Sequence, residues 1–552
     1  MTPMRRIRHL CALLLLTLLG VAAATPAQAA SYEPITGTGS TWSQNALDQW
    51  RRNVASNYGM TVNYSGVGSS TGRRDFIQNS IDYAVSEIPF QSKPEDGSAP
   101  EIPTRGYAYM PIVAGGTSFM YNLKIGGKRV TNLRLSGATV TKIFTGAITK
   151  WNHPDIQGDN PGLAMPDKAI IPVVRSDGSG STAQFTLWMS KQHPALWNTF
   201  CAATGRGNSC GLTSQYPLFG SAKGQSGSSG VAGYVSQDYG EGAITYVEYS
   251  YALNAGFPVA KVLNSAGYYV EPTASSVAVA LMFAQINTDS GSKEYLTQIL
   301  DQVYNNTDAR SYPLSSYSYM IVPTEVGGVF TAAKGKTLGT FANYMLCEGQ
   351  QQAAPLGYSP LPMNLVLAGF DQIKRIPGAD TSGIDINSCN NPTFKPGDSP
   401  AKNQLASTAP MPAECDKAGA NQCTTGTAGA AATTTDITGS GSGGSAVGDP
   451  AVAGAAGGGG AVTTAGADTA AAGDDVPLFD ENGALIAGSG GAGGGARGVA
   501  SASPFTLPET GWGGPQTLMV VAGLMLLGAV MLPPVLWQRT PRILGRRSTE
   551  ES

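Results

Sequence analysis

One stretch decides how this chain folds: Val173-Val174-Arg175-Ser176-Asp177-Gly178-Ser179-Gly180-Ser181-Thr182. Its β-branched pair predicts the end of a buried strand, and the Gly and Ser residues predict a turn that opens a helix. Backbone N–H groups at a helix N-terminus attract anions, and the helix dipole adds to this attraction. Arg175 contributes a planar guanidinium that fits an oxyanion, and Asp177 is placed to hold it. The stretch therefore predicts an anion site, with Ser179 and Ser181 as hydroxyl donors.

Two further runs have the same character. Gly37 to Trp42 precedes a helix-like stretch at 45–53, and Gly66 to Gly72 lies between Val62-Asn63-Tyr64 and a helix-like stretch at 74–79. Each run follows a short strand and leads into a helix. A single glycine turn of this kind is common and weakly specific. Three of them predict loops that converge on one anion.

In this order, the three runs resemble the substrate-binding protein of the bacterial phosphate ABC importer. The family's patterns are Gly-x-Gly-x-Thr-aromatic, Gly-x-Gly-Ser-Ser and Arg-x-Asp-Gly-Ser-Gly-Thr/Ser, and they match residues 37–42, 66–70 and 175–181. Segments 143–151, 242–249 and 312–314 agree as well. The resemblance extends from about residue 32 to about residue 376.

The resemblance implies a set of phosphate contacts. Backbone amides and hydroxyls would come from all three loops, one charged contact would come from Arg175, and Asp177 would orient Arg175 without touching the ligand. The implied phosphate ligands are Thr41, Trp42, Ser69, Glu87, Arg175, Ser179, Gly180 and Ser181. For Trp42, the backbone amide is the expected contact and the indole is expected to pack beneath the loop.

Glu87 is the one departure from the family, which places an aspartate at this position. A carboxylate accepts the proton that phosphate still carries near neutral pH and repels sulfate, which carries none. Glutamate keeps this charge but is one methylene longer, so it must fold back or displace the anion. Phosphate remains the expected ligand. A solvated loop carboxylate is the alternative for Glu87.

The fold expected for the head is α/β, because short branched strands alternate with amphipathic helices. Predicted examples are a strand at 169–174 and helices at 183–191 and 275–285, while Tyr249 and Tyr251 alternate along a predicted strand. The resemblance implies a two-lobed, type II periplasmic-binding-protein-like fold with a central cleft. Lobe 1 would comprise about 32–118 and 320–380, and lobe 2 about 120–310, with crossings near 118–122 and 312–321.

Both ends of the chain predict export and anchoring. Residues 1–29 have the basic start, apolar run and Ala-Gln-Ala site of a signal peptide. Near the other end, the LPETG motif at 507–511 precedes an apolar span at 517–537 and a basic tail at 538–552. Such a span is long enough to cross a bilayer. The arrangement resembles a sortase signal, which implies attachment of Thr510 to peptidoglycan; a permanent single-span anchor is the alternative.

Between the head, 30–390, and this signal, residues 391–506 are rich in Gly, Ala, Thr, Ser and Pro. They have few apolar side chains to bury, so they are predicted to form a disordered tether.

Six cysteines remain outside the signal peptide, and an even number in an exported chain indicates disulfides. Six cysteines allow 15 pairings. We predict nearest-neighbour pairs: Cys201–Cys210, Cys347–Cys389 and Cys415–Cys423. With no Cys-x-x-Cys and few histidines, neither a metal site nor a cofactor is expected.

The function classes narrow accordingly. A formal net charge of −3 provides no basic field for nucleic acid. Ser179 has no histidine nearby in the sequence that could act as a base and make it a nucleophile, so an enzyme is disfavoured. The leading hypothesis is a surface-anchored phosphate receptor with a monomeric head, partnered by an ABC permease. The alternatives are a non-transport phosphate scavenger, sensor or adhesin on the same fold, and transport of another oxyanion such as sulfate or molybdate.

Overall fold

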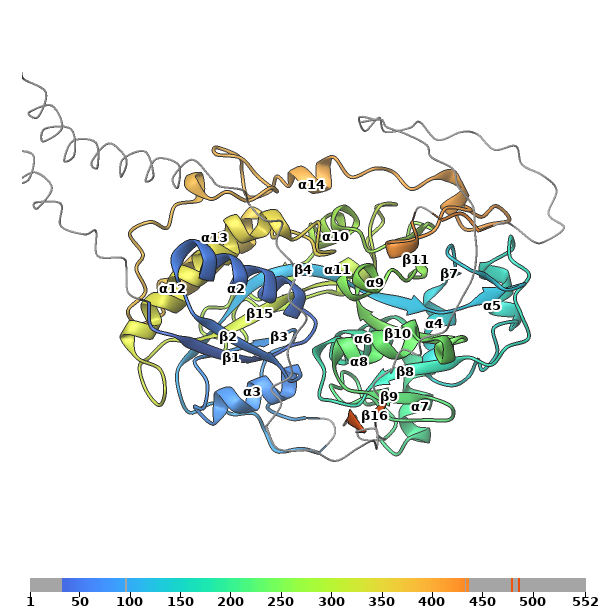
Figure 1. The fold of residues 1–552 in the computed structure, drawn as a ribbon, viewed down its shortest axis with the longest axis horizontal. Coiled ribbons are helices and arrows are strands. Elements are labelled where there is room, and N and C mark those ends of the chain that lie inside the picture. The colour runs from blue at the N-terminus through green and yellow to red at the C-terminus, as the bar shows by residue number, and fades with distance from the viewer. Residues whose placement is uncertain (1–31, 95–96, 432, 436–477, 480–484, 487–552) are drawn as a thin grey trace, which may run out of the picture. The chain divides into compact units, whose positions relative to one another are not determined.

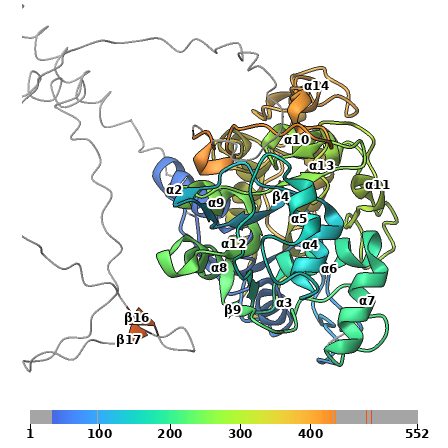
Figure 2. The ribbon, with the colours of Figure 1, turned by 90° about the vertical axis from the view of Figure 1, so that its right-hand side faces the viewer.

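The computed structural model describes residues 32–94, 97–431 and 433–435, together with two paired strands, β16 (Leu478–Phe479) and β17 (Leu485–Ile486). Residues 32–435 form the two-lobed α/β architecture that the sequence predicts (Figure 1). In Figure 1, the strands and helices of one lobe lie to the left and those of the other lie to the right. Figure 2 shows the same ribbon turned by 90°.

One eight-stranded sheet, in the order β2-β1-β3-β15-β4-β10-β8-β9, extends through both lobes. The long central strand β4 is antiparallel to β15 over residues 107–116 and antiparallel to β10 over residues 117–121. The partner of β4 therefore changes at Gly116 and Thr117, where the two lobes join. The strands are β1 (Ile35–Gly39), β2 (Val62–Gly66), β3 (Tyr83–Ser86), β4 (Tyr107–Tyr121), β8 (Ile171–Arg175), β9 (Lys223–Gln225), β10 (Ala243–Glu248) and β15 (Ser315–Pro323).

Lobe 1 surrounds strands β1, β2, β3 and β15. Helix α2 buries Leu47, Trp50 and Val54, spaced three and four residues apart, so one helical face packs on the core. Helix α3 lies directly on β1: a Cβ at Gly72 would come within 2.4 Å of the Gly39 Cα, so only glycine permits this approach. The helices are α2 (Gln44–Tyr58), α3 (Ser69–Ile77), α12 (Ala332–Leu346) and α13 (Met363–Ile373).

Lobe 2 contains the stretch that opened the sequence analysis. Strand β8 ends at Arg175 and helix α6 begins at Gly180, which confirms the predicted strand, turn and helix. The other helices here and near the junction are α4 (Gly137–Phe144), α5 (Pro154–Asp159), α7 (Pro194–Ala203), α8 (Gly227–Ser236), α9 (Tyr249–Ala255), α10 (Ala274–Leu281) and α11 (Asp301–Tyr304). The short strands are β5 (Lys124–Ile125), β6 (Lys128–Arg129), β7 (Arg134–Leu135), β11 (Lys261–Leu263), β12 (Tyr269–Val270), β13 (Gln285–Ile286) and β14 (Gln298–Ile299).

Two local predictions were wrong. The strand expected to carry Tyr249 and Tyr251 ends at Glu248, because the Glu248 carboxylate caps a new helix by accepting from the Ser250 amide at 2.8 Å. The helix expected over 275–285 ends at Leu281, and Gln285 pairs instead with Ile299 in a short hairpin.

The predicted tether also begins too early, because residues 393–435 pack on the folded head where the structure describes them. This segment, orange in Figure 1, contains α14 (Gln404–Ser407) and passes over α10. Buried Arg134 supplies the physical reason: Nη1 donates to the carbonyls of Cys415 at 3.1 Å and Asn421 at 2.7 Å. Lys261 forms an ion pair of 2.8 Å with Asp416. The segment thus gains order from the cations whose charges it satisfies, together with a few buried apolar side chains such as Phe394 and Ala406. The β16–β17 pair is a second, local departure from the predicted disorder.

Removing residues 391–435 should therefore destabilise the head. Arg134 would lose three of its carbonyl acceptors and Lys261 its carboxylate, a loss that costs roughly 3 kcal/mol or more. We expect a chain of 30–390 to melt at least about 5 °C below a chain of 30–435. Thermal unfolding followed by circular dichroism measures this difference, and equal melting temperatures would contradict the packing role.

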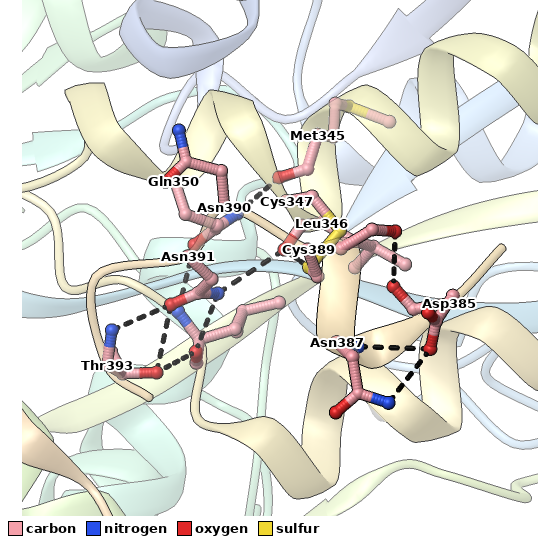
Figure 3. Close-up of a disulfide and its surroundings, with 12 residues drawn as sticks. Met345, Leu346, Cys347, Gln350, Asp385, Asn387, Cys389, Asn390, Asn391 and Thr393 are labelled. Atoms are coloured by element: carbon pink, nitrogen blue, oxygen red, sulfur yellow. Dashed lines mark hydrogen bonds between the residues drawn. A yellow bond between two sulfur atoms is a disulfide. The ribbon is translucent and has the colours of Figure 1, made fainter. Parts of the chain in front are cut away.

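The three disulfides join the predicted pairs, Cys201–Cys210, Cys347–Cys389 and Cys415–Cys423. Figure 3 shows Cys347, just after α12, bonded to Cys389. Beside this bond, the Asn391 side chain donates to the carbonyls of Leu346 at 3.3 Å and Leu361 at 3.1 Å. The chain beyond α13 is thereby fixed to lobe 1. The loop closed by the third disulfide is bound to the head, because Arg134 donates to its carbonyls at Cys415, Gly419 and Asn421.

The predicted signal peptide, the LPETG motif with Thr510, the apolar span and the basic tail lie outside the described residues. Among the residues that are described, no helix has the length and apolar character needed to cross a membrane.

Candidate functional site

The three predicted loops meet where the lobes join, each at the start of a helix. The Ser70 amide donates to the Gly178 carbonyl at 3.0 Å, and the Gly180 amide donates to Ser69 Oγ at 3.2 Å. These bonds connect the N-termini of α3 and α6 across the two lobes. The first amides of a helix have no intrahelical acceptor, so the N-termini concentrate N–H donors and positive potential in one place.

A fourth loop, which the sequence analysis missed, completes the junction. Ser228 lies near the start of α8, and its amide donates to Thr41 Oγ1 at 3.1 Å. The two hydroxyls of Thr41 and Ser228 lie 2.9 Å apart. The run Ser226-Gly227-Ser228-Ser229-Gly230 has the same Gly/Ser character as the three predicted runs, so this signal was present in the sequence.

Arg175 is almost completely buried, with 3 % of its surface exposed. Its Nε donates to Asp177 Oδ1 at 2.7 Å, its Nη2 pairs with Asp177 Oδ2, and its Nη1 donates to Ser228 Oγ at 3.3 Å. Burial alone would raise the pKa of Asp177, but the Arg175 guanidinium and the Gly227 amide together lower it below its usual value. Asp177 is therefore a charged partner that fixes the orientation of the guanidinium, as the resemblance implies.

Glu87 is fully buried at the end of β3 and belongs to this cluster. Its Oε2 accepts from Ser69 Oγ at 2.8 Å, and its Oε1 accepts from Ser318 Oγ at 2.6 Å. The carboxylate also lies against the N-terminus of α6, because a Cβ at Gly180 would come within 1.8 Å of Oε2. The alternative of a solvated loop carboxylate is thus wrong. The Glu87 carboxylate thus reaches both Ser69 and the start of α6.

The remaining predicted residues are buried in the same region but differ in their bonds. The Ser179 hydroxyl caps α6 by accepting from the Thr182 amide at 3.2 Å. Ser181 Oγ is buried with no hydrogen-bond partner among the described residues, which is costly for a buried hydroxyl. It is therefore the hydroxyl in this cluster most readily available to a ligand.

Trp42 packs as the sequence analysis expects. Its side chain is buried and contacts the Tyr358 ring edge-on, with 5.7 Å between the ring centroids. The Trp42 amide, the predicted ligand contact, donates to Ser40 Oγ at 2.9 Å. From α9, the Tyr251 hydroxyl donates to the Thr41 carbonyl and holds the first loop against lobe 2.

Ser43 and Ser318 are two further buried hydroxyl residues that sequence reasoning missed. Ser318 lies in β15, and its hydroxyl is 3.2 Å from Ser43 Oγ at the start of α2 as well as bonded to Glu87. A serine between tyrosines within a wholly buried strand was the available signal. Its significance depends on strand pairing, which places residue 318 beside β3.

A second buried carboxylate, Glu248, lies at the end of β10 opposite Thr117. Burial raises its pKa well above the usual value, although the Ser250 amide donates to Oε2 and opposes this effect. Oε1 has no partner among the described residues. Glu248 is therefore protonated in the folded state over a pH range where the unfolded chain has lost this proton.

This shift predicts a pH dependence of stability. Because the folded pKa is raised, the free energy of unfolding falls as pH rises above the unfolded value of about 4.3. Glu248→Gln mimics the protonated side chain and removes this loss. We expect the variant to melt about 3 °C or more above the unmodified protein at pH 8 and close to it at pH 4. Differential scanning calorimetry at the two pH values tests this, and a lower melting temperature at pH 8 would refute it.

The assembled groups have the chemistry of a site for a small tetrahedral anion. They combine one oriented guanidinium, helix N-termini from both lobes and several hydroxyls, all shielded from bulk water. The buried Glu87 carboxylate adds an acceptor for a ligand proton. In the described part of the chain, no group of three or more His, Cys, Asp or Glu residues has an arrangement that would hold a metal ion.

Comparison with known proteins places this architecture in a family. A sequence profile described as the PBP superfamily domain matches residues 24–348. The phosphate-binding protein PstS of Xylella fastidiosa is 34% identical over 333 residues, covering 60% of this chain and 82% of that protein. The phosphate-binding protein PstS of Haemophilus influenzae is 31% identical, and the match covers 60% of this chain and 90% of that protein. The phosphate-binding protein PstS 2 of Mycobacterium tuberculosis is 30% identical, and the match covers 59% of this chain and 82% of that protein. The chain therefore belongs to the PstS family of phosphate-binding proteins, within the PBP superfamily.

Proposed function

We propose that this protein binds inorganic phosphate in the site between its lobes and delivers it to an ABC permease. The observation that supports this proposal most strongly is that two buried groups, Arg175 and Glu87, belong to one cluster, with Arg175 oriented by Asp177. The guanidinium and the helix N-termini favour a dianion. The carboxylate favours an anion that carries a proton, because it accepts a hydrogen bond from that proton and repels an anion that has none. Phosphate meets both conditions near neutral pH, whereas sulfate meets only the first.

The proposed contacts are those implied by the family resemblance, with three additions. Arg175, Ser69, Ser181 and the amides of Thr41, Trp42 and Gly180 would donate to phosphate oxygens, and Glu87 would accept the phosphate proton. Ser179 would act mainly through its helix cap, since its hydroxyl is already bonded. Ser43, Ser228 and Ser318 are added because their hydroxyls lie in the same cluster. None of these residues is proposed to act as a nucleophile.

Isothermal titration of the ligand-stripped full chain with phosphate, and separately with sulfate, tests this function. We expect one phosphate per chain, a dissociation constant of about 1 µM or tighter, and no sulfate heat at pH 7.5. Absence of heat with either anion, from folded protein, would refute phosphate binding.

We further propose that the protein is exported and anchored at the cell surface by sortase, through Thr510. This rests on the sequence of residues 1–29 and 507–552, where the sorting motif is followed by an apolar span and four arginines. Cell-wall fractions released by muramidase should contain the protein, and Thr510→Ala should move it to the membrane fraction. Unchanged membrane location of the unmodified protein would favour the permanent single-span anchor.

Wall attachment favours one second candidate, a phosphate scavenger, sensor or adhesin that serves no permease, because a tethered head must still reach the membrane. Uptake of radioactive phosphate by cells that lack the gene separates the two. Transport predicts slower uptake that the unmodified gene restores and the Arg175→Ala gene does not. Unchanged uptake, with intact phosphate binding in vitro, would favour the non-transport role.

A further inference from the structure

A cavity of about 260 Å³ lies where lobe 1 meets the loop between β13 and β14, and it shares no lining residue with the proposed phosphate site. Its walls come from the start of β4, the end of β15, the end of α13 and the loop between β13 and β14. Three of its lining residues are cations: Arg105, Lys293 and Arg375. No lining residue is acidic. The cavity therefore has a positive wall without a compensating charge of its own.

Arg105 is the buried member of this set, with 8 % of its surface exposed. Its Nη2 donates to the Ile81 carbonyl at 3.0 Å, and its guanidinium lies 3.6 Å from the centroid of the Phe76 ring. Its Nε and Nη1 are buried without a hydrogen-bond partner among the described residues. Burial lowers the pKa of Arg105 to about 10, opposed by the charge of Asp82. A buried cation in this condition is stabilised by a negative charge in the adjoining cavity.

The surrounding acids do not neutralise the three cations. Asp82 is engaged with Lys334, at 3.0 Å, and with the Thr36 amide, at 2.8 Å. Glu325 accepts from the Gly106 amide, and Glu294 is exposed beside Lys293. Within the described part of the chain, none of the three lining cations forms an ion pair with any of these carboxylates.

Lys293 and Arg375 are exposed, so both can meet a ligand directly, while Arg105 acts from beneath. Among the described residues, the Arg375 guanidinium donates to the Gln372 side chain, at 2.9 Å, and forms no ion pair. The remaining lining combines three tyrosines, Tyr107, Tyr109 and Tyr295, with small glycine, alanine, serine and threonine residues. Tyrosine rings stack on planar groups and pack on apolar ones. Charge and wall chemistry together select a small organic molecule that bears an anionic group.

We propose that this cavity is a second binding site, for an organic phosphate with an aromatic or other planar group. The phosphate would lie between Lys293 and Arg375 above Arg105, and the organic group would lie against the tyrosines. The proposal goes beyond the proposed function and does not depend on it. The volume of this cavity, about 260 Å³, has room for an ester.

Phenyl phosphate is the probe, added to the full chain already saturated with inorganic phosphate and followed by saturation-transfer NMR and calorimetry. We expect binding with a dissociation constant of about 1 mM or tighter, and no binding of neutral benzyl alcohol. Lys293→Ala/Arg375→Ala should weaken phenyl phosphate at least about tenfold, since each contributes a charged contact. Lys374→Ala, an exposed neighbour outside the lining, should leave it unchanged.

Binding should also persist in Arg175→Ala, which separates this cavity from the interlobe site. Benzoate distinguishes the ligand classes: weaker binding than phenyl phosphate supports the phosphate assignment, and tighter binding overturns it. The site itself is overturned if phenyl phosphate fails to bind the phosphate-saturated chain, or binds the Lys293→Ala/Arg375→Ala variant as tightly as the unmodified chain. Failure here leaves the titration with inorganic phosphate unaffected, so the two proposals fail separately.

Discussion

Replacing Arg175 with alanine should weaken phosphate binding at least about 100-fold, because a charged hydrogen bond in a dry site contributes roughly 1.5–3 kcal/mol and Arg175 offers more than one. The substitution also leaves Asp177 buried without its guanidinium. The charge of that carboxylate would then repel the incoming anion. Loss of attraction and gain of repulsion act in the same direction, so the expected effect is the largest of any single substitution in the site.

Calorimetric titration of the variant with phosphate measures this loss. The matched control is Arg175→Ala/Asp177→Asn, which removes the guanidinium without leaving the repelling carboxylate. We expect this double variant to bind phosphate more tightly than the single variant and still far more weakly than the unmodified protein. A single variant that binds phosphate within about threefold of the unmodified protein would contradict the role of Arg175.

Replacing Glu87 with glutamine should change selectivity. The carboxylate accepts from Ser69 and Ser318 and is fully buried, so its charge is felt strongly by an anion at the start of α6. Glutamine removes that charge and presents N–H donors. Phosphate should weaken by about 10- to 100-fold because its proton loses a charged acceptor, and sulfate should become a detectable ligand.

Parallel titrations of Glu87→Gln with phosphate and sulfate test this prediction at pH 7.5. Glu248→Gln is the matched control, since it makes the same substitution at another buried glutamate outside the proposed contacts, and it should continue to exclude sulfate. Sulfate exclusion that survives in Glu87→Gln would remove Glu87 from the selectivity mechanism. Glu87→Asp, which restores the family's residue, should keep sulfate excluded.

Much of the site could be predicted because its signals are local. The order of β-branched pair, Gly/Ser turn and helix start is encoded in ten consecutive residues around Arg175, and the structure forms β8, the turn and α6 from them. Asp177 lies two residues from Arg175, so their pairing needed only a turn. The nearest-neighbour disulfides followed the same logic, since short separations close easily.

What escaped prediction depends on contacts between distant residues. Ser318 reaches Glu87 across 231 positions, and only the pairing of β15 with β3 brings them together. Ser228 lies 187 positions from Thr41, and the packing of the α8 start against the loop before α2 brings them together. The ordered part of the supposed tether was missed for a related reason. Its composition offers few apolar side chains to bury. Its stabilising partners, Arg134 and Lys261, lie more than 150 positions away in the sequence, so no local pattern indicates them.

The central claim is that phosphate binds among these loops with Glu87 as acceptor of its proton. A crystal structure of the phosphate-saturated protein tests this most directly. We expect one phosphate with oxygens within about 3 Å of the Arg175 guanidinium, Ser69 Oγ and Ser181 Oγ, and a short O–H···O contact of about 2.6 Å to the Glu87 carboxylate. Phosphate located elsewhere, or bound here with Glu87 turned away from it, would contradict the account.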